Sequence, residues 1–175
     1  RKTLSYPELR NFIKVELCRI ILENFEAPDA IAGVATGAIA QGALVADSLG
    51  LPYVYVRSTP KDHGLENLIE GNLKPGQKVV VIEDLISTGG SSLKAVEAIR
   101  AAGCEVVGMA AIFTYGFPVA VKRFTEAGVK LITLSNYNSM LEAALETDYI
   151  KPDDLETLKQ WRKDPASWSP APKAD

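Results

Sequence analysis

The stretch VVVIEDLISTGGSS, residues 79–92, decides the fold. It begins with β-branched apolar residues, reaches the adjacent carboxylates Glu83 and Asp84, and then passes through a turn of Ser, Thr and Gly into an amphipathic segment. A short apolar run of this kind is typical of a buried strand, and the apolar residues after the turn recur at helical spacing. The sequence therefore predicts a strand over residues 78–83, a loop, and a helix over residues 91–102.

The loop between this strand and helix has the composition of an anion site. A helix N-terminus carries unpaired backbone N–H groups and partial positive charge, and glycines let those groups close around a phosphate. Hydroxyls from Ser87, Thr88 and Ser91 can add donors. The two carboxylates cannot bind the phosphate, because like charges repel, but they suit sugar hydroxyls, Mg²⁺ or a developing positive charge. The pattern indicates a phosphorylated sugar such as a ribose 5-phosphate.

Three other interpretations of this loop are less favoured. A surface turn with incidental acids is disfavoured, because carboxylates at the end of an apolar strand are rarely without a partner. The G-x-x-x-x-G-K-[ST] phosphate loop and the G-x-G-x-x-G dinucleotide fingerprint do not occur in the sequence.

Composition limits the class of protein. With 175 residues and 47% hydrophobic content, the chain is long enough for one domain with a substantial core. The net charge of −3 and the lack of a basic stripe disfavour nucleic acid as a partner. No apolar run has the length of a membrane span and no signal peptide is evident, so a cytoplasmic protein is expected. Cys18 and Cys104 fit no metal-site spacing and are expected to be thiols in a reducing compartment.

The rest of the chain alternates between helical and strand patterns. Further helices are expected over residues 7–25, 38–49, 119–127, 139–145 and 153–161, and further strands over residues 30–35, 52–56, 105–113 and 130–134. This alternation predicts an α/β fold, a single domain with a parallel sheet flanked by helices. The domain is expected to span residues 1–163, with a flexible Pro-rich tail over residues 164–175.

Ligands bind at the carboxyl ends of the strands in such a sheet. Three predicted strand ends meet there, and they are Ala35-Thr36-Gly37, Glu83-Asp84 and Thr114-Tyr115. The turn of Ala35, Thr36 and Gly37 opens a helix and so offers a second anion site, although a tight turn with glycine for geometry alone is an equal alternative. Two anion sites beside two carboxylates suit a sugar with phosphate at one end and pyrophosphate at the other.

Residues 57–76 are too long and too polar for an ordinary connection, so we expect a functional loop or hairpin. Arg57, Lys61 and His63 lie close together in it, without the apolar neighbours of a core. A solvated charged loop is the plain alternative. The chemistry of the predicted ligand favours a functional role for these cations. On a mobile lid they can neutralise a departing pyrophosphate and exclude water.

The run IEDLISTGGSS resembles the signature of phosphoribosyltransferases that use phosphoribosyl pyrophosphate (PRPP). Together with PKDHG at residues 60–64 and AIFTYG at residues 111–116, it resembles orotate phosphoribosyltransferases over nearly the whole chain. The resemblance implies a type I phosphoribosyltransferase fold with a flexible lid loop. It also implies transfer of phosphoribose from PRPP to orotate, giving orotidine 5′-monophosphate and pyrophosphate with Mg²⁺. Family members usually carry an N-terminal hood segment ahead of RKTLSYP, which we expect to be missing here.

The resemblance also implies roles for individual residues. The implied PRPP-binding residues are Arg57, Lys61, His63, Glu83, Asp84, Leu85, Ile86, Ser87, Thr88, Gly89, Gly90 and Ser91. Lys61, Asp84 and Glu83 are the implied catalytic residues, Ala35, Thr36 and Gly37 form the pyrophosphate turn, and Ser87 lies near orotate. Mg²⁺ is held mainly by PRPP. The lid residues Arg57, Lys61 and His63 are shared across the subunits of a homodimer.

The sequence departs from some family members at three positions. Ser58 stands where some have a second lid lysine, and Gly37 and Tyr115 stand at about the places of basic orotate contacts. Three alternative functions remain: a phosphoribosyltransferase for a purine or uracil, a PRPP-sensing regulator, and an inactive relative. The KDHG lid favours orotate, the acidic charge disfavours a nucleic-acid-binding regulator, and the intact acids and lid cations disfavour an inactive chain.

Overall fold

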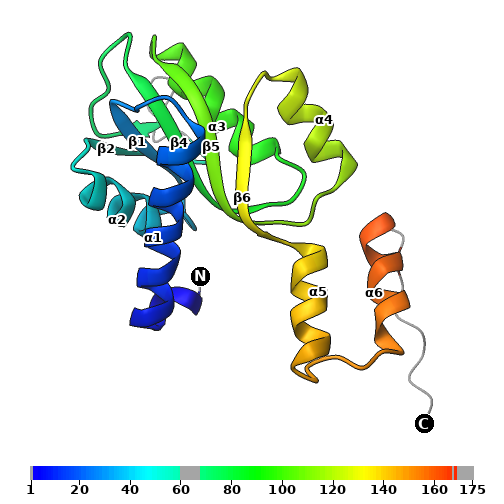
Figure 1. Cartoon of the computed structure of the whole chain (residues 1–175). Coiled ribbons are helices and arrows are strands. Elements are labelled where there is room, and N and C mark those ends of the chain that lie inside the picture. Colours follow the sequence, from blue (N-terminus) through cyan, green and yellow to red (C-terminus); the bar gives the residue numbers. More distant parts are fainter. Residues whose placement is uncertain (1, 60–67, 167, 169–175) are drawn as a thin grey trace.

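Residues 79–92 join strand β4 (Lys78–Ile86) to helix α3 (Gly90–Ala101) in the computed structural model, which describes residues 2–59, 68–166 and 168 (Figure 1). The described strands form one sheet in the order β3-β2-β1-β4-β5-β6, with β4 inside it. The other strands are β1 (Ala30–Val34), β2 (Tyr53–Val56), β3 (Ile69–Glu70), β5 (Glu105–Thr114) and β6 (Leu131–Asn136). The predicted α/β fold is confirmed.

Most of the sheet is parallel, as the sequence predicted. Strand β1 pairs with β2 and β4, and β5 pairs with β4 and β6, all in parallel. Only β3, among the described strands, runs antiparallel, against β2 at the sheet edge. The parallel strands bring their carboxyl ends to one side of the sheet, which is where such folds bind ligands.

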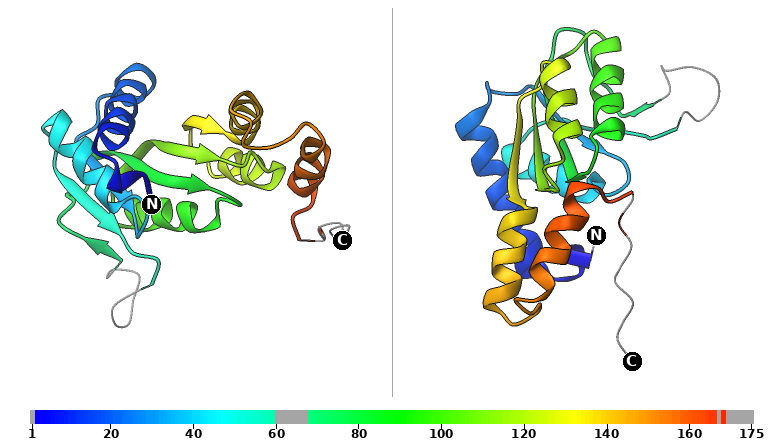
Figure 2. Two further views of the ribbon diagram at one scale, coloured as in Figure 1. Left: turned by 90° about the horizontal axis from the view of Figure 1, so that it is seen from below. Right: turned by 90° about the vertical axis from the view of Figure 1, so that its right-hand side faces the viewer.

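Helices cover both faces of the sheet, and Figure 2 shows the two layers edge-on. Helices α1 (Pro7–Asn24) and α2 (Ile39–Leu49) cover one face, where Leu17 of α1 and Val45 of α2 join a core with Val80 and Ile82. Helices α3 and α4 (Pro118–Glu126) cover the other face. Strand β1 is buried along its whole length, as expected for a strand covered on both sides.

Strand β4 is longer than the sequence predicted. It continues past residue 83 because Leu85 and Ile86 still pair with Phe113 and Thr114 of β5. Glu83 and Asp84 therefore lie within the strand rather than at its end. Successive side chains of a strand point to opposite faces, so the two carboxylates face different layers.

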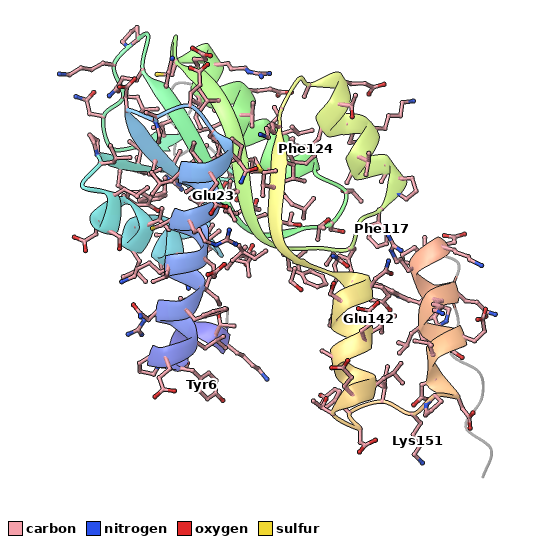
Figure 3. The ribbon with its side chains drawn as sticks, viewed as in Figure 1. Tyr6, Glu23, Phe117, Phe124, Glu142 and Lys151 are labelled. Carbon is pink, nitrogen blue, oxygen red and sulfur yellow. The ribbon has the colours of Figure 1, made fainter. Side chains whose placement is uncertain are left out.

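The carboxyl side of the sheet carries the chain's projecting parts. A short 3₁₀ turn, Lys2–Ser5, and then Tyr6 precede helix α1. The N-terminal half of α1 extends past the sheet (Figure 3). Helices α5 (Tyr137–Glu146) and α6 (Asp154–Lys163) project in the same direction beyond β6 (Figure 1). The predicted tail lies mostly outside the described ranges.

No helix in the described ranges is both long enough and apolar enough to cross a membrane.

Candidate active site

The predicted turn at the end of β1 lies directly against Asp84. A Cβ atom added to Gly37 would stand 1.8 Å from Oδ2 of Asp84, so only glycine leaves room for the carboxylate there. The Ala35 N–H donates to the Val56 carbonyl at 2.8 Å, which ties the turn to β2, and the peptide bond between Ala35 and Thr36 is cis. The structure thus brings together two of the predicted segments, the turn and the acidic pair.

Glu83 has a different environment, buried under α3 with 5% of its surface exposed. The Ser92 hydroxyl donates to its Oε2 at 2.8 Å, and the backbone N–H of Asp84 donates to its Oε1 at 2.9 Å. Burial raises the pKa of Glu83 from its ordinary 4.5 to about 8, with the nearby Asp84 adding to the rise, although the two main hydrogen bonds act against it. Through the hydrogen bond to its Oε1, the Glu83 carboxyl fixes the backbone of Asp84.

The loop after β4 has the geometry of an anion site. Gly89 caps α3 with φ 78°, a left-handed conformation that glycine adopts without strain, and a Cβ atom there would stand 2.8 Å from the Phe124 ring. Because Gly89 has no side chain to cap the helix, the N–H groups of the first turn are available to a phosphate. The Arg123 guanidinium donates to the Thr88 carbonyl at 3.0 Å and fixes the loop from α4.

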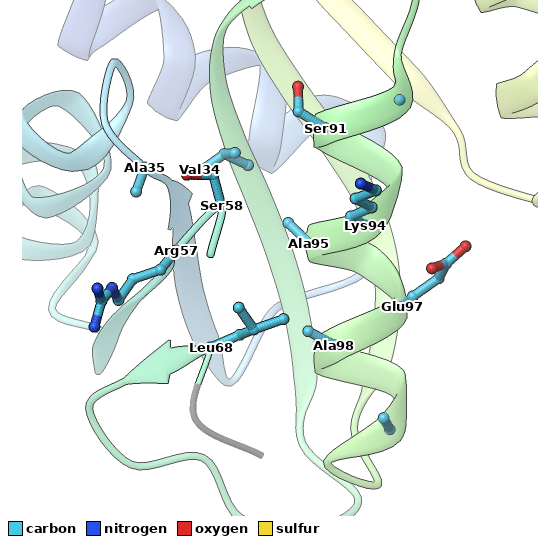
Figure 4. A pocket seen from close by; sticks show the side chains of 12 residues that line it. Val34, Ala35, Arg57, Ser58, Leu68, Ser91, Lys94, Ala95, Glu97 and Ala98 are labelled. Atoms are coloured by element: carbon cyan, nitrogen blue, oxygen red, sulfur yellow. The ribbon is translucent and has the colours of Figure 1, made fainter. Parts of the chain in front are cut away.

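Arg57, the first of the predicted lid cations, follows β2. Its Nη1 lies 3.4 Å from Oε1 of Glu70 on β3, and its backbone N–H donates to the Leu68 carbonyl at 2.8 Å. Figure 4 shows its guanidinium directed away from α3. The other lid cations, Lys61 and His63, lie outside the described residues.

A cavity of about 710 Å³ joins three of the predicted segments (Figure 4). Its lining includes Ala35 of the turn, Arg57 and Ser58 at the base of the lid, and Gly90 and Ser91 at the start of α3. Neither carboxylate of β4 lines it, and most of its lining residues belong to α3, so it lies along the face of the sheet that α3 covers.

The third predicted strand end serves mainly to anchor α6. The Arg162 guanidinium donates to the carbonyls of Tyr115 and Gly116 at 2.8 and 3.1 Å, and the Trp161 ring meets that of Tyr115 edge-on at 5.4 Å. Thr114 also accepts from the Gly116 N–H at 3.0 Å. Tyr115, in the place of a basic orotate contact, is thus held in an aromatic cluster.

The described residues offer few side-chain ligands for a metal ion at this site. The described residues contain no group of three or more His, Cys, Asp or Glu side chains arranged to hold one. Mg²⁺ commonly binds through one or two carboxylates together with substrate phosphates and water. Asp84 beside two anion sites fits that mode of binding.

Sequence reasoning missed three supporting residues. Ser92 holds Glu83, Glu70 pairs with Arg57, and Arg123 fixes Thr88. Only Ser92 could have been suspected from the sequence, because it directly follows the loop of Ser, Thr and Gly residues that was assigned to the site. The other two come from separate elements, and nothing local in the sequence indicates such contacts.

Comparisons with known proteins agree with this geometry. Residues 13–145 match the family model of the phosphoribosyl transferase domain. The chain is 72% identical to an orotate phosphoribosyltransferase of Phocaeicola vulgatus over 168 residues, which are 96% of this chain and 79% of that protein. It is 54% identical, over the same share of this chain and 80% of the other, to an orotate phosphoribosyltransferase of Listeria monocytogenes.

Solved structures show the same likeness. The crystal structure of orotate phosphoribosyltransferase from Aeropyrum pernix aligns with a TM-score of 0.76 at 27% identity, covering 86% of this chain and 82% of that one. The curated relatives from Phocaeicola vulgatus and Listeria monocytogenes are both orotate phosphoribosyltransferases. The chain belongs to the orotate phosphoribosyltransferase family.

Proposed function

We propose that this chain transfers the 5-phosphoribosyl group of PRPP to orotate, giving orotidine 5′-monophosphate and pyrophosphate in pyrimidine biosynthesis. The observation that carries the proposal is the contact of Asp84 with Gly37, which sets a carboxylate between two anion-binding turns. Such a site matches a ribose with phosphate on one end and pyrophosphate on the other. Membership of the orotate phosphoribosyltransferase family supports orotate as the acceptor.

Each end of PRPP has a proposed place. The 5-phosphate binds the loop from Ser87 to Ser91 at the start of α3, where helix N–H groups and hydroxyls meet. The pyrophosphate binds the turn from Ala35 to Gly37, with Arg57, Lys61 and His63 supplied by the lid. Ser87 lies at the boundary between the loop and orotate.

The chain's groups favour a positively charged transition state. Breaking the bond between C1 of the ribose and the pyrophosphate oxygen leaves an oxocarbenium-like sugar, which a fixed carboxylate stabilises. Asp84 takes this role because it lies at the turn, while Glu83 holds the Asp84 main chain from below. The orotate nitrogen then attacks C1 from the opposite face and inverts it, with no covalent enzyme intermediate.

Phosphoribosyltransferases of this kind generally use Mg²⁺ with PRPP, and we propose the same here. When bound, Mg²⁺ neutralises pyrophosphate charge and helps to hold the ribose hydroxyls. Asp84 is the described carboxylate placed to help hold it, with most ligands coming from PRPP.

We propose that the enzyme is a homodimer with shared lids and works in the cytoplasm. Cys18 and Cys104 are free thiols, which supports a reducing compartment. We also propose that residues 1–163 form the catalytic domain and residues 164–175 a tail.

One assay tests the function. The protein is incubated with PRPP and Mg²⁺ and with orotate, uracil, adenine or hypoxanthine in turn, and nucleotide and pyrophosphate are quantified together. We expect equal amounts of orotidine 5′-monophosphate and pyrophosphate with orotate, and a rate at least 100-fold lower with the other bases. Faster turnover of a purine or of uracil, or PRPP binding without turnover of any base, would overturn the proposal. The Asp84→Asn protein, purified in the same way, is the control for activity that comes from contaminating enzymes.

A further inference from the structure

Gln41 of α2 is a buried amide that no described residue pairs with. It is 1% exposed, and neither its Nε2 nor its Oε1 has a partner among the residues that the structure describes. Buried polar groups are nearly always hydrogen-bonded, and a buried amide left unpaired destabilises a protein more than an apolar side chain of the same shape. Stability alone would therefore favour leucine or methionine at this position, so the amide calls for a functional reason.

The position of Gln41 relates it to Asp84. Gln41 lies in the first turn of α2, which begins at Ile39, and Gly37 lies just ahead of that helix. The missing Cβ of Gly37 points at the Asp84 carboxylate, at 1.8 Å. Long side chains on a helix lean back toward its N-terminus, over the preceding turn. At the start of α2 this preference leans a side chain toward the end of the helix that adjoins the turn of Ala35 to Gly37.

We propose that Gln41 is a positioning residue for Asp84 during the reaction, an inference that rests on the proposed function. As PRPP seats on the turn from Ala35 to Gly37, the Nε2 amide of Gln41 donates a hydrogen bond to the Asp84 carboxylate. One carboxylate oxygen is then fixed by the amide, and the other is left to the ribose. A neutral amide suits this role, because it orients the carboxylate without cancelling the negative charge that the oxocarbenium-like sugar needs.

The first test replaces Gln41 by methionine, which has a similar length and no N–H donor. If the amide is unpaired in the resting enzyme, Gln41→Met raises the melting temperature by about 2–6 °C. If the amide orients Asp84, the same variant lowers kcat/KM for PRPP by about 10- to 100-fold, mostly through kcat. The matched control is Leu17→Met in the same core, which should keep kcat and KM within about twofold. Kinetic constants of Gln41→Met within twofold of the parent would overturn the proposal.

A double-mutant cycle separates positioning from a general structural role. If Gln41 acts through Asp84, adding Gln41→Met to Asp84→Asn lowers kcat/KM by less than about threefold, because the group it orients has lost its charge. If the two losses multiply, Gln41 does not act through Asp84 and the proposal is wrong.

A measurement on the unaltered chain covers the case in which Gln41→Met does not fold. The sequence has three glutamines, Gln41, Gln77 and Gln160, so in protein labelled with ¹⁵N only at glutamine side chains the amide signals can be assigned with Gln77→Glu and Gln160→Glu variants. Saturating PRPP with Mg²⁺ should move the Gln41 signal in the parent protein but not in Asp84→Asn. An unmoved signal in the parent overturns the proposal. Turnover of orotate by the parent tests the proposed function separately, so the two failures can be told apart.

Discussion

At the scale of single residues, Glu83 and Asp84 show how one strand gives two adjacent carboxyl groups different environments. Because they are neighbours on β4, they face opposite layers of the sheet. Glu83 is enclosed by α3 and held by Ser92, whereas Asp84 meets the glycine turn at the carboxyl side. The sequence alone assigned both to the ribose. The structure gives them different surroundings, and these lead to different expectations for the two side chains.

The first prediction concerns the pH dependence of stability. Because the pKa of Glu83 is raised to about 8, the folded chain binds a proton that the unfolded chain has lost above its ordinary pKa of 4.5. The free energy of unfolding therefore falls as pH rises from about 4.5 to about 8, by up to about 1.4 kcal/mol for each pH unit. In Glu83→Gln the amide oxygen can still accept from the Asp84 N–H, the amide NH2 can donate to the Ser92 hydroxyl, and the neutral side chain should remove this decline.

The measurement is urea unfolding of both proteins between pH 5 and pH 9. Glu83→Gln should match the parent near pH 5 and exceed it in stability at pH 8 and above. A parallel decline in the two proteins would show that Glu83 does not cause the pH dependence. Ser92→Ala is the companion variant, because it removes a hydrogen bond that opposes the rise in pKa.

The second prediction at this scale is that Asp84→Asn lowers kcat by about 10²- to 10³-fold, because the substitution removes the charge that stabilises the sugar in the transition state. The fold should survive, since Asp84 is only half-buried and asparagine has the same shape. Steady-state kinetics with PRPP and orotate measure the loss, and circular dichroism confirms the fold. Turnover within threefold of the parent would remove Asp84 from the catalytic role.

At the scale of elements, the β2–β3 hairpin restrains Arg57. The ion pair with Glu70 is 3.4 Å long, and both side chains are partly exposed, so its net energy is about 1 kcal/mol or less. A lid that brings Arg57 to pyrophosphate must first break this pair. We therefore expect Glu70→Gln to lower KM for PRPP, by up to about fivefold at low salt, with a smaller effect at high salt. A KM that is unchanged or higher at low salt would show that Glu70 does not hold Arg57 back.

Elements were predictable from the sequence where local pattern determines them. The strand–loop–helix unit of residues 79–92 and the covering helices follow from apolar periodicity and appear as predicted. The extension of β4 to Ile86 could not be read locally, because it depends on pairing with Phe113 and Thr114. The two-residue strand β3 lies in the stretch where the sequence predicted a loop or hairpin, and pairing with β2 rather than its own composition defines its bounds.

The site was predictable in its segments and not in its contacts. Small residues and acids at strand ends located the turn, the carboxylates and the loop, and the structure sets the first two in contact. The partners of Glu83 and Arg57 come from other elements of the chain, α3 and β3. Such partners depend on tertiary packing, which one sequence without its fold does not reveal.

At the scale of the whole molecule, the direction of Arg57 supports a site shared between subunits. Its guanidinium points away from α3, which carries the phosphate loop of the same chain, and pairs with Glu70 at the sheet edge (Figure 4). In the proposed homodimer, a cation based there would serve a neighbouring copy. The predicted homodimer with exchanged lids therefore has a consequence that can be measured by mixing inactive chains.

Asp84→Asn removes the carboxylate of a site, and Lys61→Ala removes a predicted lid cation; each homodimer should be nearly inactive. When the two proteins are mixed in equal amounts and allowed to exchange subunits, half of the dimers are mixed. If the lid is shared, one site of each mixed dimer combines an intact Asp84 with the intact Lys61 of its neighbour. Activity should then recover to about one quarter of the parent value. Distinct affinity tags on the two chains verify that exchange has occurred. If tagged mixed dimers form and remain inactive, each lid serves its own subunit, and Arg57 must leave Glu70 and turn back toward α3 before it can reach PRPP.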